Sequence, residues 1–378
     1  MREFSINWTE AQIHRLLDRV QDTELPPAPA NVGWSLGCDR GFLERFRDHW
    51  LNNYDWRDAM VGLNAWPQYL EEIDGVDVHF VHVIGEAEGR RPLLLTHGWP
   101  GSHYEFFHLI ERLVYPSRHG GASGDAFDLV IPTLIGYGYS GRPPLPVGPR
   151  HIARVWNELM TTRLGYPHYL AQGGDWGSLV TSWLGVDHGT SVRAIHLNMM
   201  PFVPTHLAET EEEEAFVAAA QTARARLSGY SILQMAKPQS LALATASNPL
   251  GIAAWILERF HDWSDLRQGS IEDIFGIDDL TTNIMLYVMP DSFATSLWLY
   301  NGVVEEGMAQ LATTRISVPT AYAAFPHDPV KPSPPRSLVE RSHNIVRWTT
   351  FEIGGHFATL EQPDLFLADL REWGEQCW

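Results

Sequence analysis

Two glycine-rich segments place reactive side chains next to predicted strand ends. The first is Gly173-Gly174-Asp175-Trp176-Gly177, in which glycines flank Asp175. This spacing is that of the G-x-S-x-G turn, where a nucleophile stands on a strained bend between a strand and a helix. An Asp there is already ionised at neutral pH and can attack carbon to form an alkyl ester. The alternative is an Asp that only caps the following helix.

The second segment, Gly354-Gly355-His356-Phe357-Ala358, offers a histidine that is free to reach the same edge of the sheet. In α/β-hydrolases the chain order is nucleophile, acid, histidine, and Asp175, Asp328 and His356 follow it. Asp328 comes after a predicted strand and would accept the imidazole N–H, which fixes the tautomer. Glu352 and Glu361 are rival acids. We expect His356, oriented by Asp328, to activate water.

A third segment, His97-Gly98-Trp99-Pro100-Gly101-Ser102, follows another predicted strand. The α/β-hydrolase fold places its second oxyanion-hole loop there. The backbone N–H groups of Trp99 and Trp176 are therefore the predicted pair of donors for a tetrahedral oxyanion. Trp99, Pro100 and Trp176 are also the predicted substrate-binding residues. Taken alone, the segment could be an ordinary turn at a strand end.

Short apolar strands that alternate with helical patterns are typical of a mainly parallel sheet covered on both faces. Residues 76–83 alternate with period two, as a half-buried strand does. Continuous apolar runs follow at 91–97, 128–132, 169–172 and 194–197, and the pattern returns at 318–325 and 344–349. The sequence therefore predicts an α/β-hydrolase fold.

The helical stretches divide the chain further. We expect an N-terminal helical meander over 1–75, a first core part over 76–204, a helical lid over 205–312 and a second core part over 313–378. A helical insert within an α/β sheet is a plausible lid over a site. The run Glu211 to Glu214 is interpreted as the solvated first turn of a lid helix, where negative charge suits the dipole.

The composition excludes several classes of function. The 378 residues carry a formal net charge of -19, which disfavours nucleic acid and anionic membranes as partners. The two cysteines, Cys38 and Cys377, lack metal-type spacing and fit a reducing compartment. Residues 136–141 fit G-x-G-x-x-G, but the prolines that follow exclude the helix needed to hold a dinucleotide. With no signal peptide or apolar span in the sequence, we expect a cytoplasmic protein that needs no cofactor and no metal.

The three glycine-rich segments together resemble those of the microsomal and juvenile-hormone epoxide hydrolases. The likeness covers nearly the whole chain and includes an N-terminal segment that wraps the core in that family. It implies that two lid tyrosines hold and protonate the epoxide oxygen; Tyr230 and Tyr300 match them by context, with Tyr287 as the fallback for the second. Members of the family often have Glu where this chain has Asp328. Their membrane-bound relatives carry an anchor helix, and we expect this chain to resemble the soluble members.

The resemblance implies hydrolysis of an epoxide to a vicinal diol through an ester on Asp175. The 15 Trp, 16 Phe and 12 Tyr residues suggest a bulky or aromatic epoxide, and soluble relatives in antibiotic (enediyne) pathways suggest a role in secondary metabolism. A haloalkane dehalogenase shares the fold and the Asp-Trp pair, but usually has a halide-binding side chain in place of Trp99. An inactive hydrolase-fold binding protein is the other alternative. The sequence leaves open the physiological substrate, the selectivity of ring opening and the oligomeric state, a homodimer included.

Overall fold

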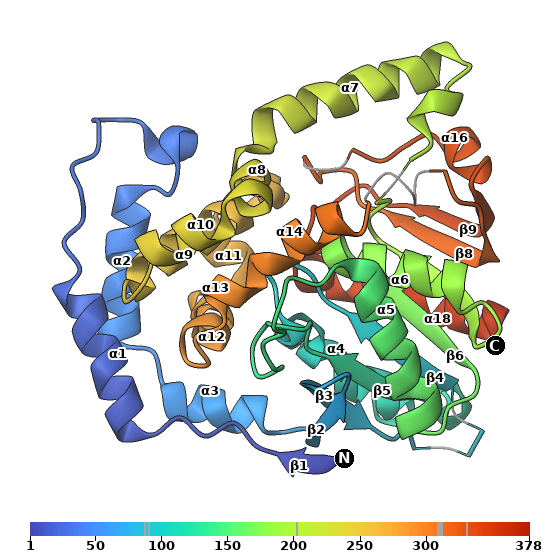
Figure 1. Ribbon diagram of the computed structural model, residues 1–378, viewed down its shortest axis with the longest axis horizontal. Coiled ribbons are helices and arrows are strands. Elements are labelled where there is room, and N and C mark those ends of the chain that lie inside the picture. The colour runs from blue at the N-terminus through green and yellow to red at the C-terminus, as the bar shows by residue number, and fades with distance from the viewer. Residues whose placement is uncertain (87, 90, 202, 308–312, 330–331) are drawn as a thin grey trace.

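The computed structural model describes residues 1–378 except 87, 90, 202, 308–312 and 330–331. These residues form one nine-stranded sheet in the order β1-β2-β3-β5-β4-β6-β7-β8-β9. The pairs from β1 through β3 to β5 are antiparallel, and all pairs from β5 to β9 are parallel. Helices cover the sheet (Figure 1). The predicted α/β-hydrolase fold is thus confirmed.

The strands lie where the apolar runs predicted them. Their bounds are β3 (Val76–Val83), β4 (Arg91–Thr96), β5 (Phe127–Pro132), β6 (Tyr169–Gly173), β7 (Val192–Leu197), β8 (Ile316–Ala324) and β9 (His343–Thr350). Along β4, Leu94 belongs to one buried cluster, whereas Leu93 and Leu95 belong to another. Both faces of the sheet are therefore packed, which explains why the run is continuously apolar.

Four helices of the core pack on these two faces. They are α4 (Phe107–Val114), α5 (Pro149–Glu158), α6 (Asp175–Asp187) and α18 (Pro363–Cys377). Helices α5 and α6 contact each other, and α18 contacts α4. The short helices α16 (Arg336–Glu340) and α17 (Ala358–Glu361) complete the C-terminal part. Helix α6 starts at Asp175, so the sheet and this helix together position the predicted nucleophile.

The insert between β7 and β8 is helical. Its helices are α7 (Glu211–Leu227), α8 (Gly229–Ala236), α9 (Pro238–Ala244), α10 (Pro249–Trp263), α11 (Ile271–Phe275), α12 (Ile277–Val288), α13 (Phe293–Ser296) and α14 (Trp298–Glu305). The predicted end of the lid at 312 lies outside the described residues. In the part of the chain that the structure covers, no helix has both the length and the apolar character to cross a bilayer.

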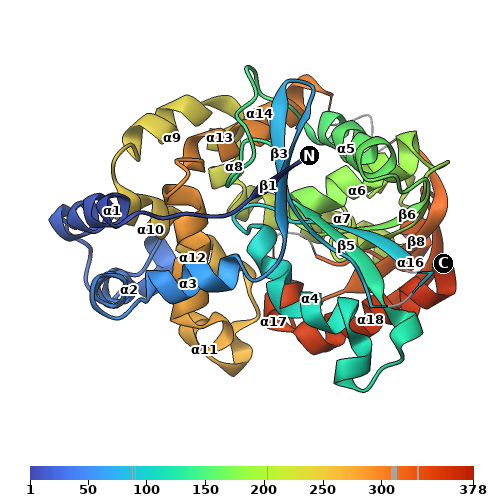
Figure 2. The same cartoon turned by 90° about the horizontal axis from the view of Figure 1, so that it is seen from below.

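The N-terminal segment is more than a helical meander, because it also supplies two strands, β1 (Arg2–Phe4) and β2 (Gln68–Ile73). Its helices are α1 (Glu10–Asp22), whose N-cap is Thr9, α2 (Arg40–Asn52) and α3 (Trp56–Leu63). Helices α1 and α2 pack on lid helices α10 and α12 (Figure 2). Tyr54 and Thr282 share a hydrogen bond of 3.0 Å across this contact. The segment therefore joins the antiparallel edge of the sheet to the lid.

The interpretation of Glu211 to Glu214 as a solvated face is wrong for one of the four. Glu213 is fully buried, while its three neighbours are exposed. Its carboxylate accepts hydrogen bonds from Ser337 at 2.7 Å and from Arg341 at 2.8 Å. These bonds lower the pKa of Glu213 to about 2. Glu213 thereby joins the start of α7 to the part of the core that follows β8. Its charge can be buried because it is paired and hydrogen-bonded.

The turn that carries Asp175 requires glycines on either side of it. Asp175 has a φ of 46°, in the left-handed region that few residues other than glycine adopt. A Cβ atom on Gly173 would lie 2.1 Å from the carbonyl oxygen of Gly177. A Cβ atom on Gly177 would lie 1.9 Å from the carbonyl oxygen of Thr96 on β4. Only glycine at both positions lets the strand, the turn and the helix approach this closely.

Replacement of Gly177 by alanine should therefore break the turn. Because the clash is with the backbone of β4, it cannot be relieved by a side-chain rotation, and Gly177→Ala should lower the free energy of unfolding by more than about 3 kcal/mol. Gly62→Ala in α3 is the matched control, since nothing lies within 4 Å of its new Cβ atom. Thermal unfolding of both variants tests the claim, and equal stability would contradict it.

Candidate active site

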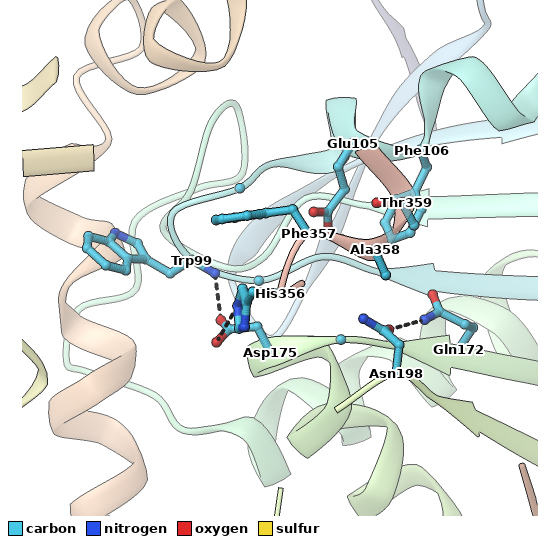
Figure 3. Close-up of a pocket in the computed structure, with 13 residues that line it drawn as sticks. Trp99, Glu105, Phe106, Gln172, Asp175, Asn198, His356, Phe357, Ala358 and Thr359 are labelled. Atoms are coloured by element: carbon cyan, nitrogen blue, oxygen red, sulfur yellow. Dashed lines mark hydrogen bonds and ion pairs between the residues drawn. The ribbon is translucent and has the colours of Figure 1, made fainter. Parts of the chain in front are cut away.

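The Asp175 carboxylate lies between two of the groups that the sequence singles out. Its Oδ1 atom accepts a hydrogen bond of 2.8 Å from the backbone N–H of Trp99. Its Oδ2 atom lies 3.5 Å from Nε2 of His356. Figure 3 shows both contacts converging on the one carboxylate. One oxygen therefore contacts the predicted oxyanion-hole loop, and the other faces the predicted base.

Asp328, not Glu352 or Glu361, contacts the imidazole. Nδ1 of His356 lies 3.0 Å from Oδ2 of Asp328, and both side chains are buried. Glu361 instead accepts the backbone N–H groups of Gly355 and Phe357, each at 2.8 Å. It therefore shapes the loop that carries His356 without touching the ring. Glu352 contributes its backbone carbonyl to Arg267.

The electrostatics at His356 favour the imidazolium. Burial alone would lower the pKa of His356, but the carboxylates of Asp328 and Asp175 outweigh it and raise the pKa well above its usual value. Any change that neutralises Asp175 removes one of the causes and lowers the pKa of His356 again.

The two predicted lid tyrosines lie against the tryptophans of the site. The Tyr230 ring stacks on Trp99 with centroids 5.5 Å apart, and the Tyr300 ring meets Trp176 edge-on at 4.6 Å. The two tyrosine rings are 5.9 Å apart. Burial and the nearby Asp175 charge raise the pKa of both phenols. Both hydroxyls therefore stay protonated at neutral pH, as a proton donor must.

Tyr287, the fallback for the second lid tyrosine, is placed differently. Its hydroxyl donates a hydrogen bond of 2.6 Å to the carbonyl oxygen of Gly101. The hydroxyl of Tyr300, in contrast, is buried beside the side chains of Tyr230 and Trp176, and within the described part of the chain it is not tied to a backbone group. Tyr300 is thus the better placed of the two to bind a substrate oxygen.

The three predicted substrate-binding residues differ in their surroundings. Trp99 lines the small cavity beside Asp175. The carbonyl oxygen of Pro100 accepts a hydrogen bond from Asn283 of α12 at 2.9 Å, which fixes the loop to the lid. Trp176 is buried under Tyr300.

A carboxyl that the sequence analysis missed also lines this cavity. Glu105, on the short helix His103–Phe106, shares the cavity wall with Asp175 and His356 (Figure 3). Burial, followed by the Asp175 charge, raises the pKa of Glu105 to about 8. A single Glu eight residues after His97 carries no signal in the sequence that separates it from a surface residue.

The glycine-rich loop at 136–141 closes on itself. Gly136 donates its N–H to the carbonyl of Gly141 at 3.0 Å, and the next helix, α5, begins only at Pro149. The helix N-terminus that a dinucleotide requires does not adjoin this loop. Among the described side chains, no group of three or more His, Cys, Asp or Glu is arranged to hold a metal ion.

Two family models match consecutive parts of the chain. The model described as "Epoxide hydrolase N terminus" matches residues 1–106. The model described as "alpha/beta hydrolase fold" matches residues 91–230. The first match covers the segment that supplies β1, β2 and the helices packed on the lid, together with the loop that carries Trp99.

Comparison with known proteins gives the same family over the full length. The chain is 30% identical to Epoxide hydrolase 1 of Sus scrofa, and the match covers 99% of this chain and 88% of that protein. The structure of Aspergillus niger epoxide hydrolase superposes with a TM-score of 0.85 at 28% identity, covering 100% of this chain and 96% of that one. Juvenile hormone epoxide hydrolase from Bombyx mori gives a TM-score of 0.89 at 27% identity, covering 99% and 94%. The resemblance read from the three glycine-rich segments is therefore confirmed, and the chain belongs to the epoxide hydrolase family.

Proposed function

We propose that this chain opens an epoxide by forming a covalent ester on Asp175 and then hydrolyses that ester to release a vicinal diol. The observation that supports this most directly is the placement of the Asp175 carboxylate. One oxygen accepts the Trp99 N–H at 2.8 Å, and the other lies 3.5 Å from His356 Nε2. A merely structural helix cap would need neither contact.

In the first step, Oδ2 of Asp175 attacks an epoxide carbon and the carbon–oxygen bond of the ring breaks. Tyr230 and Tyr300 hydrogen-bond the ring oxygen, and one of them transfers its proton to it. The raised pKa of both phenols keeps that proton in place until the ring oxygen gains charge. The product of this step is a hydroxyalkyl ester of Asp175.

In the second step, His356 removes a proton from water, and the resulting hydroxide attacks Cγ of Asp175. Ester formation has by then neutralised Asp175, so that the pKa of His356 falls. Its proton passes through solvent to the tyrosinate left by the first step, and the neutral ring can then act as a base. The Trp99 N–H, with that of Trp176, stabilises the oxyanion. As the ester bond breaks, His356 protonates the departing alkoxide, and the regenerated carboxyl of Asp175 then returns its proton to His356, which restores the resting state.

The substrate class follows from the rings around the nucleophile. Trp99, Tyr230 and Trp263 pack against one another, with centroid separations of 5.0–6.2 Å. A wall of this kind suits a bulky or aromatic epoxide.

The enzyme class would be that of ether hydrolases acting on epoxides. A role in secondary metabolism and a cytoplasmic location are hypotheses that come from the sequence alone.

The role of Asp175 can be tested by replacing it with asparagine. Asparagine tolerates a positive φ better than alanine does, so the turn should survive in Asp175→Asn. We expect diol formation from an aryl epoxide to fall by at least about 10⁴-fold, because the attacking oxygen is lost. Parallel assays should detect no halide release from a haloalkane by the wild-type protein. Halide release at the rate of diol formation, or an active Asp175→Asn variant, would argue against the proposal.

The lid tyrosines can be tested against Tyr287 as a matched control. Tyr230→Phe and Tyr300→Phe should each slow ester formation by about 10²–10⁴-fold, because a proton donor to the ring oxygen is removed. Tyr287→Phe loses only the hydrogen bond to Gly101 and should leave this rate nearly unchanged. Rapid-quench single-turnover experiments measure the step directly. If Tyr287→Phe were the slow variant, the second acid would have to be reassigned.

A further inference from the structure

The cavity beside Asp175 has the size of a water site rather than a substrate site. Its volume is about 20 Å³, and its wall includes Gly98, Glu105, Asp175 and His356. A cavity of this size holds about one water molecule and no aryl epoxide. The space therefore fits the second reactant, the water that must reach Cγ of Asp175 beside the imidazole.

Glu105 is built into the wall of this cavity. A Cβ atom on Gly101 would lie 2.9 Å from Oε2 of Glu105, and a hydrogen bond from the backbone of Gly98 also reaches this carboxyl. A Cβ atom on Gly98 would in turn lie 2.4 Å from Oδ1 of Asp175. Both carboxyls therefore rest against the loop that carries Trp99, and its glycines make the room for them.

A second, larger cavity lies behind Glu105. It has a volume of about 220 Å³, and Glu105 lines both of these cavities. The larger cavity combines apolar residues, such as Phe260 and Leu280, with polar ones, such as Asp279 and Asn283. It has room for several waters. His108, at its wall, is exposed to solvent.

We propose that Glu105 binds the hydrolytic water in the small cavity and that this water enters from the larger cavity behind Glu105. The inference rests on the proposed ester mechanism. Once the ester has formed, its alcohol part occupies the side of Asp175 that faces Tyr230 and Tyr300, so that water needs another approach. The carboxyl of Glu105 holds the water oxygen while His356 takes the proton, and Glu105 itself neither gains nor loses one.

The raised pKa of Glu105 is consistent with this role. At about 8 it keeps the carboxyl largely protonated at neutral pH. A neutral acid can donate one hydrogen bond and accept others, as a water-binding group must, without adding a second negative charge beside Asp175. The side-chain amide of glutamine has the same capacity, which supplies a conservative replacement.

Single-turnover kinetics of Glu105→Leu and Glu105→Gln test the binding role. In Glu105→Leu the ester should form at the wild-type rate but break down about 10-fold to 100-fold more slowly, because the water loses its hydrogen bond. In Glu105→Gln the breakdown rate should stay within about three-fold of wild type. A wild-type rate of ester formation shows that the variant is folded. An equal loss in both steps, or no loss in Glu105→Leu, would overturn the proposal.

The proposed entry of water from the larger cavity can be tested with two variants on α4. His108→Trp should narrow the larger cavity at its exposed wall and slow ester breakdown several-fold, with ester formation unchanged. Glu111→Trp is the control, since Glu111 is exposed on the same helix and does not line the cavity. Equal breakdown rates in the two variants would exclude this entry route. Absence of any ester in the wild-type protein would instead defeat the mechanism itself, so the two failures are distinguishable.

Discussion

The account depends on a single carboxylate that is held on a left-handed turn between a peptide N–H and an imidazole. The φ of Asp175 is strained, and the glycines around it exist because β4, β6 and α6 approach too closely for any side chain. The packing of the sheet and of α6 on both faces offsets the free-energy cost of this strain. The turn orients the Asp175 carboxylate so that its two oxygens face different partners. Trp99 and His356 therefore contact different oxygens of the same carboxylate.

The remaining groups are arranged around the same carboxylate on separate elements. Asp328 and His356 come from loops after β8 and β9, and the tyrosines come from α8 and α14 of the lid. The lid is held from outside as well as from the core. Helices α1 and α2 pack on α10 and α12, and buried Glu213 ties the start of α7 to Arg341. The N-terminal segment therefore supports the lid that carries the two tyrosines.

Local patterns in the sequence predicted the nucleophile turn and the parallel strands well. The spacing of Gly173, Asp175 and Gly177 specifies a turn by sterics alone, and continuous apolar runs specify strands buried on both faces. The order of Asp175, Asp328 and His356 then identified three groups that the structure brings together. In these cases the information lies within a few residues or in the order of elements along the chain.

Features that depend on distant partners were missed. Strands β1 and β2 form because the antiparallel edge of β3 is available, and nothing in the six residues of β2 requires it. Glu213 is buried because Ser337 and Arg341 reach it from more than 120 residues away. Glu105 was overlooked for the same reason, since its environment is created by Gly101 and by a cavity, not by its own neighbours in sequence.

The most direct measurement of the central claim is one turnover of an aryl epoxide in ¹⁸O-water, with enzyme in excess. Mass analysis of both the Asp175 peptide and the diol then locates the label. If water attacks Cγ of an Asp175 ester, the label appears on that carboxylate, and the diol of the first turnover carries none because it takes an oxygen from Asp175. Label in the diol with an unlabelled Asp175 peptide would mean that water opened the ring directly, and the covalent account would be wrong.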